Sequence, residues 1–486
     1  MAAHVSPASL TAKPIAFGTD GWRGVIAADF TFERVMQVAP LAALALAQSY
    51  GDNPSRTIVV GYDRRFLSEE FAQVAAEAVS KAGFEVLLSE GYAPTPAFSW
   101  AAKQQNALGA LVITASHNPG MYSGLKVKGG FGGSVPPEVT KKIEAMLASG
   151  YQIQENPASI QTFDPWQSYC DELRTKVDVS VIQAAIASGK LTVFADVMHG
   201  AAASGLSRLL GEGVHELSSN RDPLFEGGAP EPLPRYLENL LQTITADYQQ
   251  SPHALRVGLV FDGDSDRIAA VDGQGTFLSS QVLIPILIEH LSVHRGYTGE
   301  VIKTISGSNL IPKVAELYGL SLHQTPIGYK YIADRMLEAQ VLLGGEESGG
   351  IGYGHHIPER DALLSALYVL EAVVKSGQDL SALYANLQQK TGYTSAYDRI
   401  DLPLASMEVR SRLLEQLQTQ PPTEIAGQPV TDCLSIDGYK FQLADQSWLL
   451  IRFSGTEPVL RLYSEALTDA CVQQNLAWAK DWASAI

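Results

Sequence analysis

The sequence predicts an α/β protein: three successive doubly wound α/β domains followed by a smaller C-terminal α+β domain. Short apolar runs alternate with amphipathic stretches along most of the 486 residues, which is typical of parallel sheets covered by helices. This length exceeds what one hydrophobic core organises, so several domains are expected. The C-terminal region differs, because two apolar runs joined by a short loop precede a helical stretch.

The alternation is clearest in the first two predicted domains. "TIVVGYD" (57–63) predicts a buried strand, and residues 68–83 predict a helix that Gly83 ends. "FEVLLSEG" and "GALVITASHN" predict two more strands. Residues 189–213 predict a strand, a glycine-containing turn and a helix.

The remaining elements carry unusual loops. Residues 256–272 predict two strands joined by an acidic loop, and residues 339–356 predict a strand followed by a glycine-rich acidic loop. "WLLIRFSGTEPVLRLYSEA" predicts two strands joined by a short loop. Polar loops of doubly wound sheets gather at the carboxyl ends of the strands, where ligands bind. We expect domains at residues 1–155, 156–255, 256–380 and 381–486.

Composition excludes several classes of protein. A formal net charge of −17 leaves no basic stripe for a nucleic-acid backbone. The apolar run 35–51 contains Pro40 and is shorter than a membrane span, so no membrane partner is expected. Three widely separated cysteines and the absence of a signal-like N-terminus indicate a reducing compartment, so we expect a cytoplasmic protein. The oligomeric state is left open.

The segment "TASHNPG" (114–120), here called the serine loop, follows a predicted buried strand. Ser116 is its hydroxyl, with His117 and Asn118 directly after it. Ser, Asn, Pro and Gly are also ordinary turn residues. Taken alone, the segment is equally compatible with a simple turn.

The segment "DGDSDR" (262–267), here called the acidic loop, follows another predicted strand. It carries Asp262, Asp264 and Asp266, whose carboxylates repel one another unless a cation lies between them. A calcium-binding EF-hand is excluded, because Arg267 and Gly273 occupy the positions that need Gly and Glu. Carboxylate ligands indicate Mg²⁺, with a free or phosphorylated serine hydroxyl as a further ligand.

Four motifs in this order, "TASHNP", "DGDSDR", "GEESGG" and "RFSGTEP", resemble those of the α-D-phosphohexomutase family. That family includes phosphoglucomutases, phosphomannomutases and phosphoglucosamine mutases. The resemblance spans nearly the whole chain and implies four domains around a central cleft.

The resemblance also implies roles for the reacting groups. Ser116 is similar to the serine that carries the transferable phosphoryl group and contacts Mg²⁺ beside the three aspartates. Arg23 and Lys126 resemble the candidates for proton transfer. His117 is counted with the catalytic residues as a support for the serine loop.

For the substrate, the resemblance implies a sugar-binding pair, a clamp on the non-reacting phosphate and flanking contacts. The residues implied are Glu347 and Ser348 for the sugar, Arg452, Ser454, Gly455 and Thr456 for the phosphate, and Arg267, Lys330 and His356 as further contacts.

The function so implied is interconversion of glucose 1-phosphate and glucose 6-phosphate, with Mg²⁺ as cofactor and glucose 1,6-bisphosphate as intermediate and activator. "HIPERDA" (356–362) is similar to a stretch of phosphoglucomutases, with Arg360 where Lys is usual and Ala362 where Gly is usual, and this favours glucose. The alternatives are a glucose-1,6-bisphosphate synthase using the same serine, a phosphomannomutase, a non-catalytic sugar-phosphate sensor and a metal-dependent phosphatase. Sugar phosphates are the expected small-molecule partners.

Overall fold

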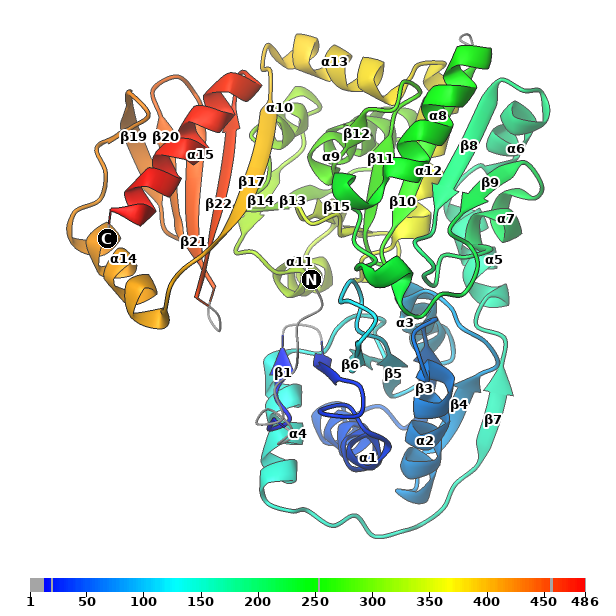
Figure 1. The fold of residues 1–486 in the computed structure, drawn as a ribbon. Coiled ribbons are helices and arrows are strands. Elements are labelled where there is room, and N and C mark those ends of the chain that lie inside the picture. The colour runs from blue at the N-terminus through cyan, green and yellow to red at the C-terminus, as the bar shows by residue number, and fades with distance from the viewer. Residues whose placement is uncertain (1–12, 19–20, 252–253, 455–457, 486) are drawn as a thin grey trace. The chain divides into compact units, whose positions relative to one another are not determined.

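The structure, a computed structural model, describes residues 13–18, 21–251, 254–454 and 458–485 (Figure 1). The chain forms two compact units. The first comprises Met1–Ser280, Ala333–Ala339 and Ser348–Leu380, and the second comprises Gln281–Ile332, Gln340–Glu347 and Ser381–Ile486. The predicted fold class is confirmed, since helices and sheets alternate through three α/β regions and a C-terminal region.

The first sheet combines parallel central strands with an antiparallel edge. Its strands, in spatial order, are β1 (Phe17–Gly18), β2 (Gly21–Val25), β6 (Tyr122–Gly129), β5 (Gly109–Ile113), β3 (Thr57–Tyr62), β4 (Glu85–Ser89) and β7 (Ile160–Phe163). Strands β3, β4, β5 and β7 are parallel, whereas β6 runs antiparallel to β5. The sheet therefore continues past residue 155, the expected end of the first domain.

Helices cover both faces of this sheet. They are α1 (Phe32–Ser49), α2 (Ser68–Lys81), α3 (Thr95–Gln104) and α4 (Pro137–Ala148). Apolar side chains of α1, α2 and α4 share one core cluster with β3, β4 and β5. Helix α3 packs directly on β3 at Gly61, where an added Cβ would lie 2.3 Å from the Phe98 ring. Glycine is needed there because interiors are close-packed.

The second sheet holds the acidic loop. Its strands, in spatial order, are β12 (Phe277–Leu278), β11 (Ile268–Val271), β10 (Leu255–Phe261), β8 (Leu191–Asp196) and β9 (Val214–Leu217). The loop joins β10 to the antiparallel β11, and β10 pairs in parallel with β8. This loop was expected in the third domain, residues 256–380; that expectation is wrong, because β10 completes the sheet that β8 begins.

The helices of this region are α5 (Gln167–Lys176), α6 (Val179–Ala187), α7 (Gly205–Leu210), α8 (Glu238–Gln250) and α12 (Ala362–Ser376), and short turns of 3₁₀-helix lie at Phe225–Gly227 and Pro234–Tyr236. Helix α12 packs against β10 and α6. Its N-terminus is capped by the Asp361 side chain, which accepts from the Leu364 N–H. Strand β16 (Ile351–Tyr353) precedes it.

The second unit contains two further sets of strands. Strands β14 (Leu322–Thr325), β13 (Glu300–Thr304) and β15 (Val341–Gly345) are parallel neighbours. The helices along this part of the chain are α9 (Ser280–Glu289), α10 (Leu310–Leu317), α11 (Tyr329–Glu338) and α13 (Leu380–Thr391), with a π-helical turn at His290–His294.

The C-terminal sheet is antiparallel. Its strands, in spatial order, are β17 (Ala396–Pro403), β22 (Val459–Ala466), β21 (Trp448–Phe453), β20 (Tyr439–Leu443), β19 (Gln428–Leu434) and β18 (Glu424–Ile425). Helices α14 (Met407–Thr419) and α15 (Asp469–Ser484) cover it with a shared apolar core. Among the described residues, no helix combines the length and apolar character that a membrane span requires.

Candidate active site

The serine loop lies between β5 and β6 and holds Ser116 in a strained backbone conformation. Ser116 is 1% exposed, and its φ of +53° lies in the left-handed region that non-glycine residues rarely adopt. The Thr114 hydroxyl accepts from the Ser116 N–H at 2.9 Å. Strain of this kind persists only where the surroundings enforce it, and it concentrates at functional sites.

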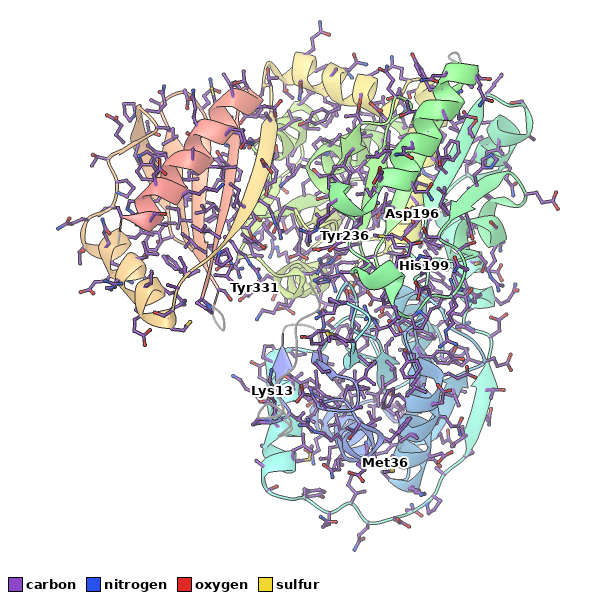
Figure 2. All side chains as sticks on the ribbon, in the orientation of Figure 1. Lys13, Met36, Asp196, His199, Tyr236 and Tyr331 are labelled. Carbon is purple, nitrogen blue, oxygen red and sulfur yellow. The ribbon has the colours of Figure 1, made fainter. Side chains whose placement is uncertain are left out.

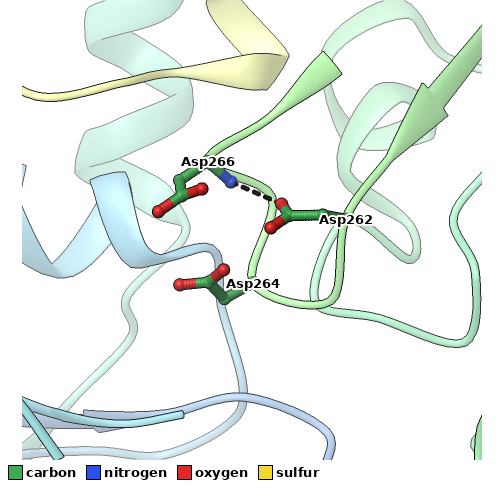
Figure 3. A group of neighbouring side chains, drawn as sticks. All are labelled: Asp262, Asp264 and Asp266. Carbon is green, nitrogen blue, oxygen red and sulfur yellow. Dashed lines mark hydrogen bonds between the residues drawn. The ribbon is translucent and has the colours of Figure 1, made fainter. Parts of the chain in front are cut away.

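The acidic loop gathers three fully buried carboxylates (Figure 3). One oxygen from each of Asp262, Asp264 and Asp266 lies within 4.8 Å of the others. Asp262 Oδ1 accepts from the N–H groups of Asp266 at 3.0 Å and Arg267 at 3.1 Å. Burial, followed by the charges of Asp266 and Asp264, raises the pKa of Asp262 well above its usual value.

The two loops are in direct contact. The Ser116 Oγ donates to Asp262 Oδ2 at 3.0 Å. A Cβ at Gly263 would lie 2.4 Å from the Ser116 carbonyl oxygen and 2.8 Å from Pro230. Glycine at 263 therefore lets the acidic loop approach close enough for the serine hydroxyl to reach its first carboxylate.

Buried donors face the remaining carboxylate oxygens. Lys126, on β6, lies 2.7 Å from Asp264 Oδ2 and 2.9 Å from Asp266 Oδ2. Arg360 Nη2 lies 2.6 Å from Asp266 Oδ2, and the Thr95 hydroxyl donates to Asp264 Oδ2 at 2.5 Å. The sequence analysis did not single out Thr95, and it considered Arg360 only as a sign of the sugar; the two residues reach the acidic loop from α3 and from the turn before α12.

The residues present fit a hard divalent cation. In the described part of the chain, Asp266 Oδ1 is buried and accepts no hydrogen bond. Three clustered carboxylates and a serine hydroxyl form an all-oxygen donor set, which suits Mg²⁺. The predicted ligands Ser116, Asp262, Asp264 and Asp266 are thus brought together.

His117 and Arg23 lie at the outer side of the serine loop. The Ser116 Oγ lies 3.3 Å from His117 Nδ1. Burial lowers the pKa of His117 well below its usual value, and the charges of Arg267 and Arg23 lower it further. Arg23 Nη1 donates to Asn118 Oδ1 at 2.6 Å. The Arg267 Nε lies 3.8 Å from Asp266 Oδ1.

His356 does not lie where the resemblance implied. It is 6% exposed, with Nε2 3.1 Å from Asp361 Oδ2 and Nδ1 3.6 Å from Glu172 Oε1. Burial lowers its pKa, but the hydrogen bonds of Asp361 and Glu172 outweigh this and raise it overall. With carboxylates facing both ring nitrogens, the predicted sugar contact is corrected to a structural role. Ser348, which is predicted to contact the sugar together with Glu347, has a partly exposed side chain.

The segment "GEESGG" (345–350), which is predicted to bind the sugar, has two adjacent glutamates. Glu347 Oε2 accepts from Ser306 Oγ at 2.6 Å and from Thr304 Oγ1 at 3.4 Å. Glu346, directly before Glu347, is buried and accepts from the Gly328 N–H at 3.1 Å. Lys330, near this glycine in sequence, lies over the Tyr331 ring.

The predicted phosphate clamp follows β21. Arg452 Nε lies 3.1 Å from Asp437, and although burial lowers the pKa of Arg452, the hydrogen bond and charge of Asp437 raise it overall. Ser454 is buried, and its carbonyl accepts from Arg410 Nε at 2.8 Å. Gly455 and Thr456 lie outside the described residues.

A cavity of about 490 Å³ lies at the carboxyl end of β8. Asp196, His199 and Tyr236 line it (Figure 2). His199 Nδ1 lies 3.0 Å from the Asn220 carbonyl and its Nε2 lies 3.4 Å from Glu226. Both ring nitrogens of His199 therefore face polar partners in its own region of the chain.

Comparison with known proteins covers almost the whole chain. Residues 14–154, 167–275 and 279–391 match the α/β/α domains I, II and III of phosphoglucomutase/phosphomannomutase, and residues 408–476 match its C-terminal domain. The first three domains are thus matched in chain order, with the acidic loop in domain II.

Individual relatives agree. The chain is 28% identical over 470 residues to a phosphoglucomutase/phosphomannomutase of Thermococcus kodakarensis, covering 95% of this chain and 96% of that protein. It is 28% identical to a phosphoglucosamine/phosphogalactosamine mutase of Sulfurisphaera tokodaii, covering 95% and 97%. A crystal structure from Thermus thermophilus, assigned as a phosphomannomutase, superposes with a TM-score of 0.83 at 31% identity and covers 98% of this chain and all of that one. The four matched domains and these relatives establish that the chain belongs to the α-D-phosphohexomutase family, the phosphoglucomutase/phosphomannomutase enzymes.

Proposed function

We propose that the chain interconverts glucose 1-phosphate and glucose 6-phosphate through a phosphorylated Ser116 and a glucose 1,6-bisphosphate intermediate. The observation that carries this proposal is the hydrogen bond of 3.0 Å between the Ser116 hydroxyl and Asp262 within a buried trio of carboxylates. Phosphoryl transfer depends on charge neutralisation and in-line positioning, which such a pocket supplies.

The reaction proceeds in two transfers. In the first, the free hydroxyl oxygen of the sugar monophosphate attacks the phosphorus of phosphoserine 116. The bond between phosphorus and Ser116 Oγ breaks, the hydroxyl proton passes to a base, and the bisphosphate forms. The intermediate then reorients, and Ser116 Oγ attacks the phosphorus of its other phosphate. The bond between that phosphorus and the sugar oxygen breaks, the sugar oxygen takes back the proton held by the base, and the isomeric monophosphate is released.

The side chains around Ser116 divide the work. Arg23 and Lys126 are the candidates for moving the hydroxyl proton, and the two ion pairs of Lys126 hold it beside the reacting group. His117 supports the serine loop, with its Nδ1 3.3 Å from the Ser116 Oγ. Asp262, Asp264 and Asp266 would hold Mg²⁺ with Ser116. When bound, the ion supplies neutralisation of phosphoryl charge.

The substrate is held at both ends in this proposal. Glu347 and Ser348 contact sugar hydroxyls, with the adjacent buried Glu346 of the same segment as an added candidate. Arg452, Ser454, Gly455 and Thr456 bind the non-reacting phosphate, and Arg267 and Lys330 are the flanking cations.

Glucose is proposed from the resemblance of "HIPERDA" to phosphoglucomutases, whereas relatives named for glucosamine phosphates favour an amino sugar as the second candidate. In the structure, Arg360 of this stretch contacts Asp266 and Glu359 contacts Lys128. In this proposal the two contacts stabilise the surroundings of the acidic loop and do not select the sugar.

The sugar and reaction type are tested together with purified enzyme, Mg²⁺ and catalytic glucose 1,6-bisphosphate. We expect the highest kcat/KM with glucose phosphates among glucose, mannose and glucosamine 6-phosphates, and equilibration of the two monophosphates. A preference for glucosamine phosphate would change the substrate. Accumulation of glucose 1,6-bisphosphate beyond the enzyme concentration, from a different bisphosphate donor, would indicate the synthase instead.

Replacing Ser116 by alanine should lower turnover by about 10⁴-fold or more, because the nucleophile is lost. Intact-mass analysis should find part of the wild-type protein heavier by one phosphoryl group, and none of the variant. Ser123→Ala is the control, since Ser123 is equally buried on β6 and its hydroxyl makes no hydrogen bond in the described residues. Wild-type-like activity of Ser116→Ala would contradict the assignment.

Chelation should abolish activity, and Mg²⁺ should restore it. Asp264→Asn should weaken Mg²⁺ binding, measured by isothermal titration calorimetry, by at least about tenfold, since even outer-shell partners contribute that much. Asp272→Asn serves as the control, because Asp272 is a buried aspartate that accepts backbone N–H groups just past β11. Activity that persists in excess chelator is the result that excludes a metal site.

Arg452→Ala should raise KM for sugar phosphate by roughly 10- to 100-fold, because a charge-assisted hydrogen bond contributes about 1.5–3 kcal/mol. The exposed Arg412 of the same C-terminal region provides a charge-matched control, Arg412→Ala, whose KM should equal that of the wild type. If KM is unchanged in Arg452→Ala, the segment after β21 is a turn and not a clamp.

A further inference from the structure

Arg65 is a fully buried arginine directly behind the serine loop. It follows β3 and is 0% exposed. Its Nη2 donates to the carbonyl oxygens of Ser116 at 2.5 Å and Asn118 at 2.6 Å. Its Nη1 donates to those of Pro119 and Tyr122, both at 3.1 Å. One guanidinium thus donates to three carbonyl groups of the serine loop and to one at the start of β6.

The guanidinium is itself fixed in place. Asp63 Oδ2 lies 3.2 Å from Arg65 Nε, while Asp63 Oδ1 accepts from the Arg65 N–H at 3.0 Å and from Ser68 Oγ at 2.8 Å. The Arg65 Cζ lies over the Phe225 ring, 4.8 Å from the ring centre. The planar fork of arginine suits such a site, whereas the lysine ammonium is a point donor.

The carbonyls that Arg65 holds include the one at the strained residue. Ser116 has φ +53°, and its carbonyl oxygen is also the atom that a Cβ at Gly263 would approach to 2.4 Å. All peptide bonds described are trans, so the His117 N–H points away from Arg65. In the part of the chain that the structure describes, this N–H has no backbone acceptor. Arg65 therefore fixes both the contact with the acidic loop and the orientation of the next peptide group.

We propose that Arg65 is the positioning residue of the phosphorylated serine: its guanidinium holds the serine loop in the conformation that brings Ser116 Oγ to the acidic loop. This role rests on the proposed phosphoryl transfer at Ser116. Arg65 touches neither the phosphoryl group nor the sugar in this scheme; it acts through backbone carbonyls. Its loss misplaces the nucleophile while the substrate-binding residues remain.

The test compares Arg65→Lys with Arg256→Lys. Arg256 is the matched control, because it is 1% exposed, faces Asp247 and donates to the carbonyl oxygens of Ala254, Asp247 and Ser251. It lies at the start of β10, at the opposite end of that strand from the acidic loop. Both variants lose a forked buried contact, so both should lower the melting temperature.

Kinetics separate the two variants. For Arg65→Lys we expect kcat to fall about 100-fold with KM unchanged, as for a nucleophile displaced by about 1 Å. Phosphorylation of Ser116 by glucose 1,6-bisphosphate, followed by intact mass, should slow in parallel. Arg256→Lys should keep the wild-type kcat and phosphorylation rate. An equal kcat for Arg65→Lys and Arg256→Lys would overturn the proposal.

A second variant covers the case in which Arg65→Lys does not fold. Asp63→Asn leaves the guanidinium in place but removes the charge that fixes it, and should lower kcat in the same direction without changing KM. An unchanged kcat in this variant overturns the positioning role. If wild type and Arg256→Lys are both inactive with every hexose phosphate, the proposed function fails instead, so the two failures are distinguishable.

Discussion

The candidate active site depends on one contact: the Ser116 hydroxyl donates to a carboxylate of the acidic loop, whose three aspartates are all buried. Burying Asp262, Asp264 and Asp266 together is unfavourable, and the structure offsets it with Lys126, Arg360, Thr95 and backbone N–H groups. These donors come from separate parts of the first unit. The packing of this unit therefore brings cationic and hydrogen-bonding partners to the acidic loop.

The serine and acidic loops could be picked out from the sequence because their signal is local. The acids of "DGDSDR" alternate within five residues directly after an apolar strand, and "TASHNP" ends another strand, so the α/β rule alone places both at carboxyl edges of sheets. Predicting that the edges meet required the family resemblance. The alternating elements at 57–63 and 68–83 were predicted for the same local reason and correspond to β3 and α2.

The misses come from contacts between residues far apart in the chain. Thr95 and Arg360 lie 169 and 94 residues from the aspartates that they contact. Contacts over such separations cannot be predicted from local sequence patterns. The acidic loop was assigned to the wrong domain because a β10 that pairs back with β8 has the same local pattern as a strand that opens a new sheet. His356 was misjudged because its partners Glu172 and Asp361 are brought to it only by packing.

The backbone conformation of Ser116 bears on which hydroxyl residue can occupy this position of the serine loop. Threonine offers the same hydroxyl, yet its branched Cβ makes a positive φ a severe outlier, whereas serine tolerates it at moderate cost. A conformation imposed by the loop thus discriminates between two alcohols of nearly equal reactivity. Main-chain geometry alone therefore favours serine over threonine at position 116.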